Sequence, residues 1–436
     1  MKKLICVTLF LVNFQLTVAQ QAETAYLFFE NLITSNHKAA YGLLSPKLKQ
    51  KIADEAVLAQ LWNSVQFELG AYKDTTESLV ESVDSVMHVF IGCTFQKKGN
   101  LDIFLQINLQ NTIESFLVKP EKTKKIYVFP KYHKPENYVK TYFNVANKKW
   151  TLFGNLYQSS VKSPTKTLVI LGHGSGPGNR DGDIGVNKMF RDIAIGLANY
   201  GISTYSFDKR TFTYPNEAFL QSDSFTVWDE TIADVLAIAD SFKKSGLYDR
   251  IIFAGHSLSA NQAPRIAKHH KFDGVVMLAG NVTPLDSVVL YQIGFLGKLN
   301  KTENLEDIKA DMLEKIDFLR NGKPDKYSSL SALPLPVCAA WWLDIIKYNP
   351  IETALETQTP MLILQGKEDY QVTTAEFQKW KNGLKNRPNT YFKTFNGLNH
   401  AFMPGKKKNG PKSYDMNANV PEHIIKVITD FVKAIE

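Results

Sequence analysis

The chain has 436 residues, of which 44% are hydrophobic and 22% are charged, and its formal net charge is +8. This length allows two or three domains, and the composition is ordinary for a globular enzyme, which excludes disordered and fibrous classes. The lysines are scattered and form no basic stripe interleaved with aromatic residues, so we expect no nucleic-acid partner.

Residues 1–19 are typical of a secretory signal peptide. Two lysines follow the initial Met, an apolar run extends from Leu4 to Val18, and small Ala19 offers a cleavage position. A membrane anchor is the alternative, but the run is shorter than the ~20 residues of a spanning helix and contains two polar amides. We therefore expect a secreted or periplasmic protein without a membrane span, whose charge falls from +8 to +6 after cleavage.

The mature chain keeps two cysteines, Cys93 and Cys338. They are expected to lie in different domains as buried free thiols, with a disulfide as the alternative. The sequence contains no Cys/His pattern with zinc spacing, so neither a metal nor a cofactor is expected.

Residues 20–118 are predicted to form a small α+β domain. Amphipathic helical spacing runs through residues 22–70, and strand-like alternation follows through residues 71–118. This region resembles the cone-shaped, nuclear-transport-factor-like domains of unknown function, a resemblance that implies no catalytic residue. Residues 119–138, rich in Lys and Pro, are interpreted as a linker.

Residues 139–436 are predicted to form an α/β domain. A hairpin over 139–157, with Trp150–Phe153 as its second strand, precedes apolar strands that alternate with amphipathic helices, as in a parallel sheet covered on both faces. A helical, aromatic insertion at about 284–356 is expected to form a cap over the site. The predicted strands are Leu168–Leu171, Ile202–Ser206, Ile251–Ala254, Gly274–Ala279, Met361–Gln365 and Tyr391–Phe395.

The string GHSLS at 255–259 follows one of these strands and opens a helix. A serine on a sharp strand-to-helix turn is a nucleophile elbow, and the backbone N–H of Leu258 is then directed at a developing oxyanion. We therefore predict Ser257 as the nucleophile. The alternative is an ordinary serine cap at a helix N-terminus, and the last position holds Ser259 instead of the usual Gly.

A serine hydroxyl needs a base, and two later strands end in suitable loops. Met361–Gln365 is followed by Asp369, and Tyr391–Phe395 is followed by His400, which completes the order Ser, Asp, His. We predict His400 as general base and Asp369 as its orienting carboxylate, with Glu368 as the rival acid. His256, directly before the serine, is expected to point away from it.

The string HGSGP at 173–177 follows the first parallel strand and predicts the second arm of an oxyanion hole. We assign the amide of Ser175, paired with that of Leu258. A simple Gly-rich turn is the alternative, and no phosphate-loop pattern is present. Asp181 and Asp183 nearby are interpreted as solvated loop acids, with a cation site as the other possibility.

Taken as a set, these strings resemble the secreted α/β-hydrolase esterases of the dienelactone-hydrolase and prolyl-oligopeptidase-like group. The carrying residues are HGSGPGNRDGD at 173–183, FDKRT at 207–211, GHSLSANQAPRIA at 255–267, LAGN at 278–281, LQGKEDYQVT at 364–373 and NH at 399–400.

The resemblance covers residues 139–436 and implies a serine hydrolase that acts on small-molecule carboxylic esters without a cofactor, through Ser257, His400 and Asp369. The group usually has Gly where this chain has Ser259, which puts the rate in doubt more than the activity. A peptidase with the same three residues and a non-catalytic binding protein are the alternatives. No oligomeric state is predicted.

Overall fold

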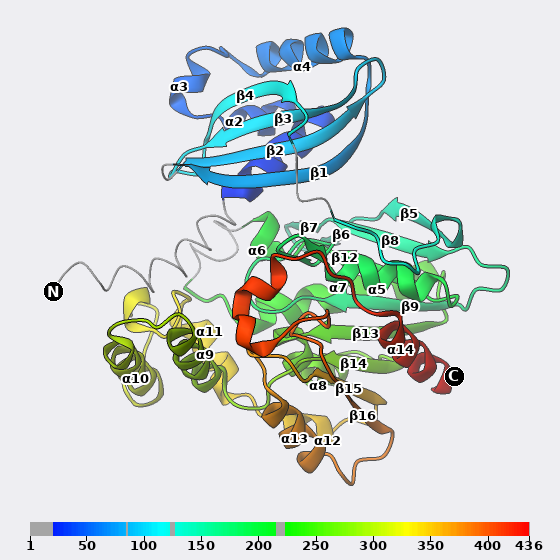
Figure 1. Ribbon diagram of the computed structural model, residues 1–436, viewed down its shortest axis with the longest axis vertical. Helices are drawn as coiled ribbons and strands as arrows, with labels where there is room; N and C mark the ends of the chain where they lie inside the picture. The colour runs from blue at the N-terminus through cyan, green and yellow to red at the C-terminus, as the bar shows by residue number, and fades with distance from the viewer. Residues whose placement is uncertain (1–20, 84–85, 123–126, 215–222, 436) are drawn as a thin grey trace. The chain divides into compact units, whose positions relative to one another are not determined.

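The computed structural model describes residues 21–83, 86–122, 127–214 and 223–435. The predicted signal peptide lies outside the described residues, as does part of the predicted linker. The chain divides into two units, Met1–Tyr127 and Val128–Glu436 (Figure 1).

The first unit is a four-stranded antiparallel sheet with helices packed on it. Alternate residues of the second strand, such as Val89, Ile91 and Cys93, are buried against the helices, as the period of two requires. The strands, in sheet order, are β1 (Tyr72–Val83), β2 (Val86–Phe95), β3 (Gly99–Ile107) and β4 (Ile113–Pro120). The helical segments are residues 21–33, α2 (His37–Gly42), α3 (Pro46–Lys49) and α4 (Glu55–Leu69).

The second unit is built on a sheet that has eight strands among the described residues. Six neighbouring strands pair in parallel, and two further strands at one edge are joined to them by antiparallel pairing. The order is β16 (Thr390–Phe395), β15 (Met361–Gly366), β14 (Gly274–Leu278), β13 (Arg250–His256), β9 (Thr167–Gly172), β12 (Ser203–Phe207), β8 (Gly154–Ser159) and β5 (Tyr138–Tyr142). This order and these directions define the α/β-hydrolase fold, so the predicted fold class is confirmed.

Helices cover both faces of this sheet (Figure 1). Val169 and Ile252 point to one face, where α5 (Met189–Ala198) and α14 (Glu422–Ala434) pack. Their strand neighbours point to the other face, which is covered by α7 (Ala233–Ser245), α8 (Leu258–His269) and α13 (Thr374–Gly383). Because both faces of the sheet are covered, a strand such as β9 is apolar at every position from Leu168 to Leu171, which is the signal that predicted it.

A helical insertion lies between β14 and β15. Its residues pack into a cluster around Trp341 and Trp342, which also takes in Leu258 from the start of α8. The insertion contains α9 (Leu285–Leu299), α10 (Leu305–Asn321), η4 (Leu330–Ala332), α11 (Ala339–Lys347) and α12 (Pro350–Leu355). We refer to these residues, 285–355, as the cap.

The start of the second unit differs from the predicted hairpin. The residues around Trp150 form β7 (Trp150–Leu152), which pairs with β6 (Val145–Asn147) in a separate small ladder. The strand that pairs with β5 in the main sheet is β8 instead. Short elements complete the unit: η1 (Pro135–Asn137), β10 (Asp183–Ile184), β11 (Asn187–Lys188), α6 (Arg210–Thr213), a π-helical turn η3 (Trp228–Ile232) and η5 (Lys407–Tyr414).

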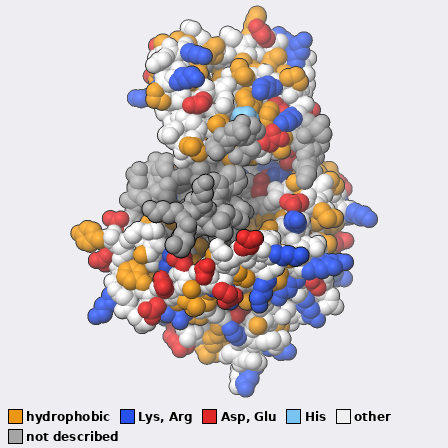
Figure 2. Space-filling view, turned by 60° about the vertical axis from the view of Figure 1, so that its left-hand side comes forward, with side chains coloured by type: hydrophobic (Ala, Val, Ile, Leu, Met, Phe, Trp, Pro, Cys, Tyr) orange, Lys and Arg blue, Asp and Glu red, His pale blue; other side chains and the backbone are white. Residues whose placement is uncertain are grey.

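Both cysteines are free thiols: Cys93 is buried, and Cys338 is partly exposed. Among the described residues, no helix has the length and apolar character that crossing a membrane requires. On the visible face, Lys and Arg side chains lie among Asp and Glu side chains (Figure 2).

Candidate active site

Ser257 stands between the end of β13 and the start of α8. Its backbone has φ 54° and ψ −111°, a conformation that non-glycine residues rarely adopt. Gly255 permits this sharp turn, because a Cβ there would stand 2.5 Å from the carbonyl oxygen of Ser259. The Ser257 amide donates to the carbonyl of Leu278 at 2.8 Å, which ties the turn to the neighbouring strand.

His400 and Asp369 meet from the loops that follow β16 and β15. Nδ1 of His400 lies 2.7 Å from Oδ2 of Asp369, and both side chains are buried. The other carboxylate oxygen accepts the amides of Gln371 at 2.8 Å and Val372 at 2.9 Å, and Oδ2 also accepts the side-chain amide of Gln365 at 3.0 Å. The carboxylate is therefore held rigidly, and its contact makes Nδ1 the protonated nitrogen of a neutral His400.

Glu368, the rival carboxylate, does not reach His400. Its Oε2 accepts the backbone amide of Lys407 at 2.9 Å, so it fixes the loop before η5. The structure thus brings Asp369, and not its neighbour, to the imidazole.

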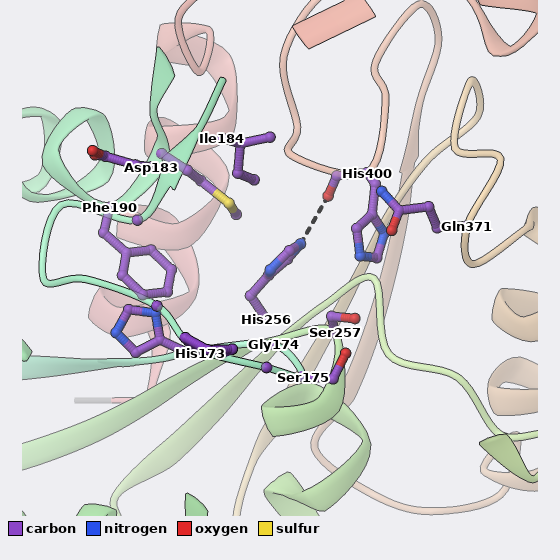
Figure 3. Close-up of a pocket in the computed structure, with 15 residues that line it drawn as sticks. His173, Gly174, Ser175, Asp183, Ile184, Phe190, His256, Ser257, Gln371 and His400 are labelled. Atoms are coloured by element: carbon purple, nitrogen blue, oxygen red, sulfur yellow. Dashed lines mark hydrogen bonds between the residues drawn. The ribbon is translucent and has the colours of Figure 1, made fainter. Parts of the chain in front are cut away.

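Ser257, His400 and Ser175 line one pocket with a volume of about 240 Å³. Figure 3 shows the His400 ring on the same side of the pocket as Ser257, with Ser175 next to the serine. The further lining residues are His173, Gly174, Gly176, Pro177, Gly178, Gly182, Asp183, Ile184, Met189, Phe190, His256 and Gln371.

His256 also lines this pocket, and the centroid of its ring lies 4.6 Å from the centroid of the His400 ring. Its Nε2–H donates to the main-chain carbonyl of His400 at 2.9 Å (Figure 3). Burial, together with the nearby His400, lowers the pKa of His256 to about 3. His173 is similar, since its Nε2–H donates to the carbonyl of Phe207 at 2.6 Å and burial lowers its pKa to about 3. Both rings are therefore neutral near pH 7 and act as fixed donors.

The two predicted oxyanion donors come from the helix that follows the serine and from the loop that follows β9. Leu258 is the first residue of α8, so its N–H is among the helix amides that have no partner within the helix. Ser175 follows β9 and lines the pocket, between two glycines. Gly174 lies close to Ser257: a Cβ added at Gly174 would be 3.1 Å from Cβ of Ser257.

The stretch at 207–211 braces the loops around the pocket through ion pairs. Asp208 binds Arg180, and Arg210 binds Asp234. Between them, Lys209 binds Glu230, and the two side chains are 1% and 2% exposed. The sequence could not predict these ion-pair partners, because they come from other segments of the chain.

Asp181 and Asp183 are also paired. Asp181 binds Arg191, and Asp183 accepts from Lys188 at 3.1 Å. In the part of the chain that the structure describes, no group of His, Cys, Asp or Glu side chains is arranged to hold a metal ion. The two acids are thus loop braces, and not the cation site considered above.

Two side chains of the site, Gln365 and Glu230, were missed by sequence reasoning. Gln365 is the last strand residue before the acid loop and steadies Asp369. Glu230 lies in the π-helical turn η3, and Trp341 lies in the cap, where its indole N–H donates to Glu230 at 2.6 Å. Only the polar character of Gln365 in an apolar strand gave a signal in the sequence.

Comparison with known proteins agrees with the fold. Residues 339–435 match the model of the dienelactone hydrolase family. The chain is 28% identical over 405 residues to Esterase EstD of Thermotoga maritima, a match that spans 92% of this chain and 93% of the relative. The resemblance inferred from the motifs is thereby confirmed: the chain is similar to the dienelactone hydrolase family over these residues and to an esterase over most of its length, and these matches support a hydrolase.

Solved structures with similar folds include two esterases. The Pyrococcus furiosus esterase has a TM-score of 0.45 and 15% identity, with 69% of this chain and 92% of that chain covered. Est1E from Butyrivibrio proteoclasticus has a TM-score of 0.43 and 14% identity, with 67% and 98% covered.

Proposed function

We propose that this protein is an exported serine hydrolase that cleaves carboxylic esters through Ser257, His400 and Asp369. The observation that carries the proposal is the 2.7 Å contact between Asp369 and His400, which lines the same pocket as Ser257 on its strained turn. The similarity to Esterase EstD supports the ester class.

In the proposed mechanism, Nε2 of His400 takes the proton of the Ser257 hydroxyl as Oγ attacks the ester carbonyl. The amides of Leu258 and Ser175 bind the oxyanion of the tetrahedral intermediate. His400 then protonates the leaving alcohol, which departs and leaves an acyl-enzyme. His400 next deprotonates a water molecule, whose attack releases the carboxylic acid and restores the serine.

The pocket favours a neutral ester over a substrate with a free amino terminus. Asp183 is the acidic side chain among the described residues that line it, and its carboxylate is already paired with Lys188. Capture of a substrate ammonium would have to break that pair. The apolar contribution comes from Ile184, Met189 and Phe190, which suit a short acyl or alkyl group.

The test is hydrolysis of p-nitrophenyl esters from acetate to octanoate by the protein and by Ser257→Ala. We expect a loss of about 10⁴-fold or more in kcat for the variant, with the optimum among short chains. Labelling by a fluorophosphonate probe should also disappear in the variant. Equal slow rates, with no labelling of the unaltered protein, would exclude the proposal. Faster turnover of aminoacyl amides than of esters would favour the peptidase.

Export is the second part of the proposal and rests on the signal-like residues 1–19. We expect the full chain, expressed in a Gram-negative host, to reach the periplasm with a new N-terminus near residue 20. A chain begun at residue 20 should stay in the cytoplasm. Retention of the full chain in the cytoplasm with residues 1–19 intact would contradict export.

A further inference from the structure

A buried lysine holds the loop that carries the proposed oxyanion donor Ser175. Nζ of Lys209 donates to the carbonyl of Gly174 at 2.7 Å and to the carbonyl of Gly176 at 3.0 Å. The Lys209 side chain is 1% exposed, so these contacts are shielded from water. Hydrogen bonds from a charged donor in such surroundings are roughly twice as strong as neutral ones.

The direction of the Ser175 amide follows from this contact. The carbonyl of Gly174 and the N–H of Ser175 belong to one planar trans peptide, in which the two groups point in opposite directions. Because Lys209 draws the carbonyl toward the protein interior, the N–H of Ser175 is turned away from Lys209. Ser175 lines the pocket, so this opposite side is where the substrate carbonyl has to bind.

Glu230 connects this lysine to the cap. Its Oε1 accepts from Lys209 and from the amide of Gly176 at 3.3 Å, while its Oε2 accepts from the indole N–H of Trp341 at 2.6 Å. A buried ammonium needs such a carboxylate, since an unpaired charge inside a protein is strongly destabilising. One oxygen of the Glu230 carboxylate therefore binds Lys209 and the oxyanion loop, and the other binds the cap.

The second proposed donor also contacts the cap. The side chain of Leu258 packs in the same apolar cluster as Trp341 and Trp342. Each arm of the proposed oxyanion hole is thus linked to the cap, Leu258 by an apolar contact and the Ser175 loop through the polar contacts of Glu230.

We propose that Trp341, Glu230 and Lys209 form a positioning relay through which the cap fixes the orientation of the Gly174–Ser175 peptide. The three residues touch neither substrate nor Ser257, and they act on catalysis through the Ser175 amide. The inference rests on the proposed ester hydrolysis, and it makes the cap a determinant of turnover as well as a cover for the pocket.

Two adjacent tryptophans provide a matched test. Trp341→Phe removes the indole donor to Glu230, whereas Trp342→Phe removes an indole donor to the carbonyl of Leu335, inside the cap. Both residues are buried in the same cluster, so both changes perturb cap packing to a similar degree. We expect kcat for p-nitrophenyl acetate to fall about 10-fold or more in Trp341→Phe, with KM within about threefold, and to stay within about threefold in Trp342→Phe.

Inhibition by a small alkyl boronic acid supplies a readout that cap stability alone would not move. Its adduct with Ser257 is tetrahedral and places an oxygen in the oxyanion hole, so its Ki should rise in Trp341→Phe by about the factor by which kcat falls. The charge-neutral double variant Lys209→Met with Glu230→Gln should show the same parallel change. The two residues are changed together, because a change of only one of them would leave an unpaired charge buried in the protein.

The outcomes separate the two proposals. An inactive, unlabelled parent protein would overturn the ester hydrolase assignment and with it the relay. An active parent, together with equal kcat and Ki in the Trp341 and Trp342 variants, would overturn the relay alone.

Discussion

The hydroxyl of Ser259 donates a hydrogen bond to the main-chain carbonyl of His173. This contact joins the turn that bears Ser257 to the loop that bears Ser175. Ser259 is completely buried, and it occupies the position where the group named above usually has Gly. The extra hydroxymethyl group, which was expected to affect the rate, is therefore accommodated as a tether between the two halves of the proposed oxyanion hole.

Replacement of Ser259 by Ala should weaken both stability and turnover. The carbonyl of His173 loses its donor in the interior, which costs roughly 1–3 kcal/mol of unfolding free energy. We expect a lower urea midpoint and a kcat reduced several-fold at nearly constant KM. Ser159→Ala is the matched control, because Ser159 makes the same type of bond, to the carbonyl of Ala198 at 2.7 Å, away from the pocket. Similar kcat losses in both variants would contradict a role of the tether in catalysis.

The two neighbouring acids Glu368 and Asp369 should differ sharply when each is converted to its amide. Asp369→Asn removes the carboxylate that holds Nδ1–H of His400, and about a 10⁴-fold loss of kcat is expected. Glu368→Gln keeps an oxygen for the Lys407 amide and should change kcat less than about threefold. Steady-state kinetics on p-nitrophenyl acetate would decide. A larger loss for Glu368→Gln would reassign the orienting carboxylate.

The protein should lose stability in acid through His173 and His256. Both have a pKa near 3 in the folded state against an ordinary value of 6.5, so between these values the unfolded chain binds more protons. Unfolding free energy should thus fall as the pH drops from 6.5 toward 3, by up to about 1.4 kcal/mol per pH unit for each ring, and stay level above 6.5.

Urea unfolding between pH 7 and pH 4 measures this dependence. His256→Gln keeps a donor for the carbonyl of His400 but no longer titrates, so its midpoint should fall less steeply than that of the parent protein. Identical slopes for the two proteins would show that the His256 ring is protonated to the same extent in both states, contrary to its burial.

The sequence predicted the parts of this fold that depend on local patterns. Runs such as Leu168–Leu171 are apolar at every position because both faces of the sheet are covered, and loops after such strands open on one edge. The polar β1 was not identified individually, because its composition is largely polar and its place in the sheet follows from pairing with β2. The partner of Lys209 was equally inaccessible, because Glu230 reaches Lys209, and Trp341 reaches Glu230, only through tertiary packing.

A side chain at Gly174 of the oxyanion loop should obstruct the reaction at Ser257 without preventing folding. A Cβ at this position would lie 3.1 Å from Cβ and 3.6 Å from Oγ of Ser257, in the space that a bound carbonyl has to enter. The contact is tight enough to require a shift but involves no backbone clash, so Gly174→Ala is expected to fold. We expect its thermal midpoint to stay within a few degrees of the parent, while both kcat/KM for esters and the rate of fluorophosphonate labelling fall by at least about 10-fold. Labelling at the parent rate in a folded Gly174→Ala protein would mean that the reacting group approaches Ser257 from another side, and would remove Ser175 from the oxyanion hole.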